Sequence, residues 1–261
     1  MQRTLLLTAA LLAAGVIVLP AQQVSNDANP LNRNFSIRLG GISVPPITGA
    51  PFSATAVIEF QQTMPDGSVA TYRNINLIGR DSQGRTHGEM RPRMPESFHS
   101  VPPISEVHLF DPQTLVSTIY EPATHIARLE LMPSPTKDSS PSSTSNPFVK
   151  VEDLGSDTID NIDVKGTRRT QTIPAQVNGT GATLTVIDEY WYSEELHVNL
   201  SLRHSDPRIG VQTIKLTNVK REDPEPSFFE VPPDYKIVDM TPPADAPAAR
   251  HNSAVTASPT P

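Results

Sequence analysis

The chain has 261 residues, of which 27 are proline and none is cysteine, and its formal net charge at pH 7 is −7. A negative balance disfavours nucleic-acid binding, which needs clustered Lys and Arg against phosphate, and electrostatic docking on anionic lipid. Without cysteine, disulfides, thiol catalysis and a lipidated cysteine are excluded. The length suits one domain with a sizeable core, and the prolines favour short strands and loops over helices.

The first 21 residues have the pattern of an export signal. Arg3 supplies the positive start, residues 5–19 are an apolar run, and Pro20-Ala21 form a plausible cleavage end. The run is shorter than a membrane span needs and stops at a proline. We therefore expect an exported protein, periplasmic or secreted, that is not integral to a membrane once processed.

Residues 22–50 lack clean periodicity and are predicted to be an extended lead-in to one β domain, residues 51–240. Apolar residues alternate with others over Ala54–Phe60, which predicts a strand with one buried face. A turn is expected at Met64–Gly67, where Pro, Asp and Gly follow one another. Residues 69–77 return as the next strand.

Two further hairpins are predicted before the middle of the chain. One spans Arg80–Arg91, and the other spans residues 107–120 around an Asp-Pro turn. A strand follows at Ala127–Leu131. Residues 133–147 are dominated by Ser, Pro and Thr, and we predict a flexible loop because such a composition buries too little apolar surface.

The C-terminal part carries the clearest β pattern. After strands at residues 148–154 and 162–173, Thr183–Tyr192 is β-branched and aromatic, and its alternation slips at Val186-Ile187, which suggests a bulge. Leu196–His204 alternates strictly, and Asp206-Pro207 begins a turn into the next strand.

The last residues of the domain are broken by prolines. Pro224, Pro226, Pro232 and Pro233 surround Phe228-Phe229, which we expect to plug one end of the core. At most one helical turn is predicted, over Asp223–Phe229, with Asp223 as its cap. Residues 241–261 are rich in Ala, Pro and Thr and are predicted to be a disordered tail.

The aromatic strand Glu189-Tyr190-Trp191-Tyr192, the following hairpin and the Phe228-Phe229-Glu230-Val231-Pro232 segment resemble the C-terminal half of the LolA/LolB-type fold. That resemblance implies a mainly β fold: one strongly curved antiparallel sheet forming an incomplete barrel, with few short helices here. Periplasmic members of that family carry lipoproteins or lipids in the hollow of the sheet. The helices that pack against the hollow in that family have no evident counterpart in this sequence.

The chain also resembles an uncharacterised family of secreted bacterial proteins over most of residues 51–238. The matching pieces are Arg80-Asp81-Ser82-Gln83-Gly84-Arg85, Asp111-Pro112, Gly166-Thr167-Arg168, Ile173-Pro174-Ala175, Glu189-Tyr190-Trp191-Tyr192-Ser193 and Asp206-Pro207-Arg208.

No catalytic or metal constellation is visible in the sequence. His204-Ser205-Asp206 holds the residue types of a hydrolase triad, but neighbours on a strand point to opposite faces, so a turn is the better interpretation. Asp157, Asp160 and Asp163 recur every three residues, unlike the ligands of a calcium loop. We expect no enzyme activity, no cofactor and no metal.

Two binding features remain, each with a structural alternative. Phe60, Tyr190, Trp191 and Tyr192 are candidates to line an apolar groove, or else they pack in the core. Arg80, Arg85, Arg91 and Arg93 are candidates for anion contact, or else they form cross-strand pairs with acidic side chains.

These observations predict an exported, non-enzymatic binding module that holds a lipid, a lipoprotein or another apolar ligand in the concave face of its sheet. The alternative is an interaction or sensor domain that contacts another protein of the cell envelope. A filled concave face would count against the first hypothesis, and a large exposed apolar surface would favour the second.

Overall fold

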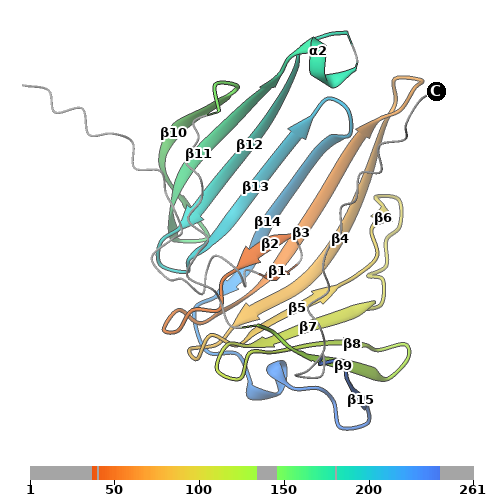
Figure 1. Cartoon of the computed structure of the whole chain (residues 1–261), viewed down its shortest axis with the longest axis vertical. Helices are drawn as coiled ribbons and strands as arrows, with labels where there is room; N and C mark the ends of the chain where they lie inside the picture. Colours follow the sequence, from red (N-terminus) through yellow and green to blue (C-terminus); the bar gives the residue numbers. More distant parts are fainter. Residues whose placement is uncertain (1–36, 40, 134–145, 180, 242–261) are drawn as a thin grey trace, which may run out of the picture.

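A computed structural model describes residues 37–39, 41–133, 146–179 and 181–241, and in this part nearly every regular element is a strand (Figure 1). The strands are β1 (Ile37–Leu39), β2 (Ile42–Val44), β3 (Phe52–Thr63), β4 (Val69–Arg80), β5 (Thr86–Met90), β6 (Met94–Pro95), β7 (Glu106–Asp111), β8 (Val116–Glu121), β9 (Ile126–Leu131), β10 (Val149–Ile159), β11 (Ile162–Ile173), β12 (Leu184–Ser193), β13 (Val198–Asp206), β14 (Gly210–Lys220) and β15 (Lys236–Asp239). A short helix, α2 (Ala175–Asn178), and a 3-10 turn, η1 (Pro226–Phe229), complete it.

Thirteen strands form one sheet, in the order β10-β11-β12-β13-β14-β3-β4-β5-β7-β8-β9-β15, with β6 beside β4. The described part of the sheet does not close into a barrel. All neighbours are antiparallel except β15, which runs parallel to β9. The predicted curved, mainly β fold is thus confirmed, with this one parallel pair as a difference.

The predicted hairpins form where the turn residues stand. Pro65-Asp66-Gly67 joins β3 to β4, Asp81–Gly84 joins β4 to β5, and Pro207–Ile209 joins β13 to β14. Asp side chains help each turn, because Asp66, Asp81 and Asp206 each accept a backbone N–H two residues farther along.

Three expectations are corrected. The lead-in contains a hairpin, since β1 and β2 pair with each other. The register is regular at Val186-Ile187, and the irregularity falls between Trp191 and Tyr192. Asp223 caps no helix: its carboxylate accepts the Ser82 N–H at 2.6 Å, and the single helical turn begins at Pro226.

The predicted leader, most of the predicted loop 133–147 and nearly all of the predicted tail 241–261 lie outside the described residues. Within the described part, no helix is long and apolar enough to span a membrane.

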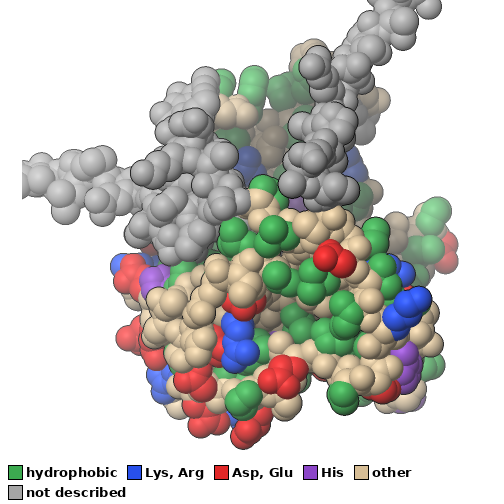
Figure 2. Space-filling view, turned by 60° about the horizontal axis from the view of Figure 1, so that its bottom comes forward, with side chains coloured by type: hydrophobic (Ala, Val, Ile, Leu, Met, Phe, Trp, Pro, Cys, Tyr) green, Lys and Arg blue, Asp and Glu red, His purple; other side chains and the backbone are tan. Residues whose placement is uncertain are grey.

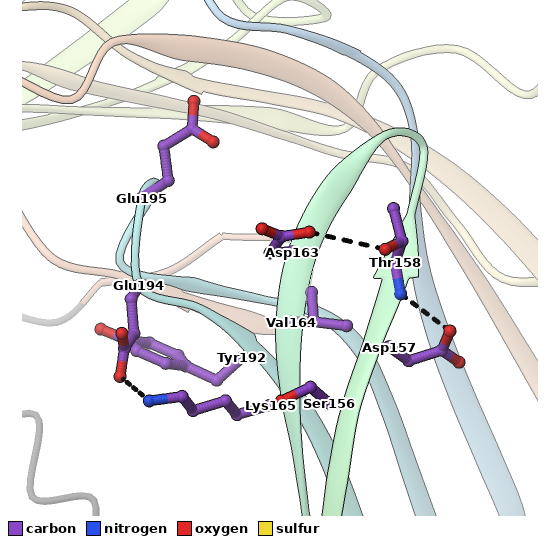
Figure 3. Close-up of a pocket in the computed structure, with 9 residues that line it drawn as sticks. All are labelled: Ser156, Asp157, Thr158, Asp163, Val164, Lys165, Tyr192, Glu194 and Glu195. Atoms are coloured by element: carbon purple, nitrogen blue, oxygen red, sulfur yellow. Dashed lines mark hydrogen bonds and ion pairs between the residues drawn. The ribbon is translucent and has the colours of Figure 1, made fainter.

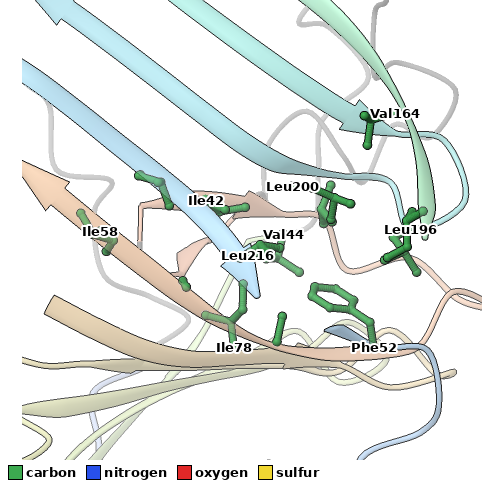
Figure 4. Close-up of a cluster of buried hydrophobic side chains, with 14 residues drawn as sticks. Ile42, Val44, Phe52, Ile58, Ile78, Val164, Leu196, Leu200 and Leu216 are labelled. Carbon is green, nitrogen blue, oxygen red and sulfur yellow. The ribbon is translucent and has the colours of Figure 1, made fainter. Parts of the chain in front are cut away.

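The main core lies between the sheet and the β1–β2 hairpin (Figure 4). Ile42 and Val44 of β2 are buried among side chains from β3, β4, β11, β13 and β14. The hairpin approaches so closely that a Cβ on Gly41 would stand 2.6 Å from Ile214 Cδ1, and the φ of +84° there also favours glycine. The face that carries Ile214 is therefore covered by the hairpin at this level.

Arg80, at the end of β4, links the hairpin to both halves of the sheet. Its guanidinium is fully buried and donates to three carbonyl oxygens: Ala50 from Nε (3.0 Å) and Nη2 (2.6 Å), Pro45 from Nη1 (2.8 Å) and Leu196 from Nη2 (2.6 Å). In a flat sheet β4 and β13 would lie about 14 Å apart, three strand spacings. The contact with Leu196, just before β13, therefore shows that the sheet bends back on itself, and the Arg80 face is the concave one.

The opposite, convex face of β4 and β5 is covered by the C-terminal segment. The Phe228 ring stacks on His87 at 3.7 Å between centroids, and the Phe228 carbonyl lies 2.5 Å from His87 Nδ1. Farther along, Tyr235 contacts Tyr120 edge to face at 5.1 Å. Phe229 is buried as well, in agreement with the expected plug. Figure 2 shows this end of the molecule, where hydrophobic side chains reach the surface and acidic ones gather to one side.

Replacing Arg80 tests the bend. Burial lowers the pKa of Arg80 to about 10, so the side chain is charged at neutral pH, and its charge is met by carbonyl dipoles. We expect Arg80→Lys to lower the free energy of unfolding by about 3 kcal/mol, because an ammonium presents its three N–H donors from one nitrogen and cannot reproduce the four hydrogen bonds of the planar guanidinium. Urea titration measures this. Arg73→Lys, at a half-exposed position, is the control and should change stability by about 0.5 kcal/mol or less.

The buried His87 predicts a pH dependence of stability. Burial lowers the pKa of His87 to about 4, against the pull of the Phe228 carbonyl. The unfolded chain, with a pKa of about 6.5, binds the proton first. The free energy of unfolding therefore keeps its full value above pH 6.5. It falls as the pH drops from 6.5 to 4, by about 3 kcal/mol in total.

Urea titrations at several pH values between 7 and 4 measure this loss. His87→Gln should flatten the dependence, whereas His125→Gln, at an exposed position, should keep the wild-type slope. An unchanged slope in His87→Gln would assign the pH dependence to other groups.

Candidate functional site

A row of six side chains crosses the concave face beside the part that the hairpin covers. The residues are directly opposite one another on consecutive strands, from β11 to β4: Arg169, Asp188, His204, Gln212, Phe60 and Tyr72. Directly opposed residues share a face, as do residues two apart on a strand. Because Ile58 and Ile214 stand two residues from Phe60 and Gln212 and belong to the core, the row lies on the concave face. We call these six residues the groove row.

The groove row has a charged end. Asp188 is only 8% exposed and lies 2.6 Å from His204 Nδ1 and 3.3 Å from Arg169 Nη1. Arg169 Nη2 also donates to Gln171 Oε1 at 3.4 Å. A guanidinium has five N–H donors, so these two long contacts leave Arg169 able to bind a further carboxylate or phosphate.

The other end of the groove row is aromatic. Phe60 and Tyr72 are opposite each other and partly exposed, and the Arg93 guanidinium lies over the Phe60 ring at 4.9 Å from its centroid. One row nearer the core, Tyr190 and Leu202 are opposite each other and also partly exposed. The part of the concave face beside the hairpin is thus charged at one end of the groove row and aromatic at the other.

The four predicted groove residues do not converge. Phe60 and Tyr190 lie on the uncovered concave face. Trp191 instead packs against the main core beside Gly166, where a Cβ would stand 2.7 Å from the indole ring. Tyr192 follows the register shift and lines a separate cleft near the β12–β13 turn. The shift moves Trp191 and Tyr192 out of the simple alternation on which their grouping depended.

The four predicted anion-contact arginines are also dispersed. Arg80 is buried among carbonyls, and Arg93 lies over Phe60. Arg85 pairs with Asp81 at 2.6 Å, and Arg91 forms an ion pair with Glu89. Both ion pairs are local, four and two residues apart in the chain, and neither is the expected pair between strands. Arg80 uses backbone oxygens in place of acidic side chains.

The cleft that Tyr192 lines has a volume of about 550 Å³ and is acidic (Figure 3). Its lining residues are Ser156, Asp157, Thr158, Asp163, Val164, Lys165, Tyr192, Glu194 and Glu195. Lys165 pairs with Glu194 at 2.7 Å, and Arg221 with Glu195 at 3.3 Å. Asp157 and Asp163 contact Thr158 and have no ion pair to the described residues, so the cleft is suited to a cation.

The residues His204, Ser205 and Asp206 form no triad. His204 pairs with Asp188 on the neighbouring strand, while Asp206 binds Arg208 in the turn at 2.6 Å. Among the described residues, no three His, Asp or Glu side chains are placed to hold a metal ion.

Sequence reasoning missed the charged end of the groove row. Asp188 stands two residues from Val186 and Tyr190, so the alternation already placed it on the same face as apolar neighbours. Its partners His204 and Arg169 come from other strands, and no local pattern links them to it.

Comparisons with known proteins are confined to structure. No family model and no curated protein matches the sequence. An uncharacterised conserved protein from Thermus thermophilus has 12% identity and a TM-score of 0.36, over 80% of this chain and 94% of that one. MucB in the MucA/MucB complex from Pseudomonas aeruginosa has 12% identity and a TM-score of 0.41, over 77% of this chain and 61% of that one.

A LolA superfamily protein from Nitrosomonas europaea has 11% identity and a TM-score of 0.26, over 69% of this chain and 90% of that one. LolA superfamily structures are thus among those similar to this chain, as the sequence resemblance predicts. Identities and TM-scores of this size assign no function.

The sole tryptophan reports on the position of Trp191. We expect Gly166→Ala to displace the indole ring, which lies within contact of the new methyl group, and to lower stability by about 1–3 kcal/mol. Tryptophan emission and urea titration measure the two effects. Thr172→Ala, at an exposed site on the same strand, should leave the emission unchanged. Unchanged emission in Gly166→Ala would contradict the packing described.

Proposed function

We propose that this protein is an exported, non-enzymatic binding module that holds a lipid or another amphipathic ligand on the uncovered part of its concave face. The observation that carries the proposal is the groove row, with Phe60 and Tyr72 at one end and Arg169 at the other. An apolar chain would lie against the aromatic end and against Tyr190 and Leu202. A carboxylate or phosphate would bind Arg169.

The hairpin limits the size of this site. Ile42 and Val44 fill the concave face beneath them, so the ligand would lie on the open sheet beside the core and not in an enclosed cavity. Partial exposure of the ligand favours exchange over permanent storage. An exported location remains a prediction from the leader.

A second candidate function is binding of a partner protein of the envelope through the acidic cleft. Its carboxylates Asp157 and Asp163 have no cationic partner among the described residues. A basic segment of a partner would complement them, with the charge steering the encounter.

Binding of a fluorescent long-chain fatty acid tests the first proposal. We expect Phe60→Ala to weaken binding about tenfold through lost apolar contact. Phe98→Ala, at a surface position 45% exposed outside the groove, is the matched control and should change affinity less than about twofold. Arg169→Ala should weaken binding of the acid but not of the corresponding long-chain alcohol.

Two results would contradict the groove. One is a wild-type protein that binds neither the acid nor the alcohol, and the other is an equal loss in the Phe60 and Phe98 variants. Salt-sensitive binding of a lysine-rich peptide, lost in the Asp157→Asn/Asp163→Asn variant, would then favour the partner-binding function.

A further inference from the structure

The two ends of the strands β10–β14 and β3 differ in polarity. At one end stand the β3–β4 turn, the β13–β14 turn, α2 and the start of β10, which lie along the upper edge of the sheet in Figure 1. Each carries exposed large hydrophobic side chains: Met64 (38%), Val69 (60%), Phe148 (49%), Val177 (74%) and Ile209 (50%). We call these five residues the apolar rim.

The pairing of the strands confirms that these turns are neighbours. Val211 is opposite Gln61, which places Ile209 beside the end of β3 that leads to Met64. Thr172 donates its N–H to the Phe148 carbonyl at 2.8 Å, so Phe148 stands next to the strand that leads into α2. The rim therefore runs along one end of the sheet from β10 to β4.

The opposite end of the same strands is acidic. The β10–β11 turn contains Asp160, the β12–β13 turn contains Glu194 and Glu195, and Glu222 and Asp223 follow β14. None of these described turns carries an exposed large hydrophobic residue. The rim itself carries little net charge, because Arg208 pairs with Asp206 at 2.6 Å and Asp66 is the remaining acid.

We propose that the apolar rim docks on the surface of a lipid bilayer, with the acidic end pointing away from it. The five apolar side chains stand on four separate segments, which suits lipid, since each segment can enter the acyl boundary independently of the others. A protein partner would need one continuous apolar surface in their place. With a net charge of −7 and no cation cluster on the rim, docking depends on apolar contact and not on anionic headgroups.

Docking in this orientation deepens the proposed function, on which this part of the inference rests. Phe60 lies on β3, four residues before Met64, which directly follows this strand, so Phe60 is about 13 Å from the rim. Arg169, at the other end of the groove row, lies three residues before Thr172, which contacts Phe148 of the rim. Both ends of the groove row therefore lie near the bilayer in this orientation. A lipid could pass from the bilayer to the groove along β3 and β4 without crossing the acidic end.

Co-sedimentation of the purified chain with vesicles tests the proposal. We expect binding to vesicles of phosphatidylcholine, little affected by salt, and no tighter binding when half of the lipid is phosphatidylglycerol. The rim variant Val177→Ser/Ile209→Ser should lower the partition coefficient at least about tenfold. The control Val151→Ser/Ile237→Ser removes two side chains of similar exposure on the edge strands and should partition like the wild type.

Circular dichroism checks that both variants are folded, which we expect because all four positions are exposed. Three results would overturn the docking: no binding of the wild type to either vesicle, equal losses in the rim and control variants, or binding to phosphatidylglycerol vesicles alone that salt abolishes.

The experiments can refute the ligand-binding proposal and the docking proposal independently of each other. Phe60→Ala should keep vesicle binding while losing the fatty acid, and the rim variant should keep the fatty acid while losing vesicle binding. A wild type that binds vesicles through the rim but no fatty acid sustains the docking and refutes the groove. The reverse result refutes the docking and sustains the groove.

Discussion

The shape of this protein depends on one buried cation. The Arg80 guanidinium holds carbonyl oxygens of Pro45, Ala50 and Leu196, which belong to the hairpin connection and to the far half of the sheet. Among the described residues no carboxylate pairs with it; backbone dipoles meet its charge, and the Phe52 ring lies 5.3 Å away. Such a charge is costly to bury unless every donor finds an acceptor. Its position therefore fixes how far the sheet bends and where the hairpin enters.

The bend gives the sheet a concave and a convex face, and different segments of the chain cover them. On the concave side, β1 and β2 complete the core beside the groove row. On the convex side, the C-terminal segment covers β5, β7 and β8 with aromatic rings, and β15 extends the sheet beyond β9. Segments from the two ends of the described chain thus cover opposite faces of the sheet. The surface that remains for recognition is what these two segments do not cover.

Alternation and turn chemistry were sufficient to predict most of the sheet. The strands of the β3–β4 and β13–β14 hairpins follow apolar residues at every second position, and the turns form at Asp, Pro and Gly. The β1–β2 hairpin was not predicted, because two strands of three residues are too short to show a period. Its partners Ile214 and Leu216 lie far along the chain, so no local pattern could reveal it.

The site was less predictable than the fold for a similar reason. Arg80 looked like surface charge in the sequence, although its place two residues after Ile78 put it on the buried face. The grouping of Tyr190, Trp191 and Tyr192 assumed that neighbours in an aromatic run act together. Side chains of neighbouring residues on a strand point to opposite faces of the sheet. The register shift after Trp191 separates these three aromatic residues further. The groove row has residues from six strands, which only the pairing brings into line.

The hairpin has a consequence for the order of assembly. Val44 enters the chain early, yet the residues that bury it include Leu216, more than 170 positions later. Contacts of such sequence separation form late, after the intervening chain has paid the entropy of closing the loop. The main core around Val44 is therefore complete only when strands from both ends of the domain are in place.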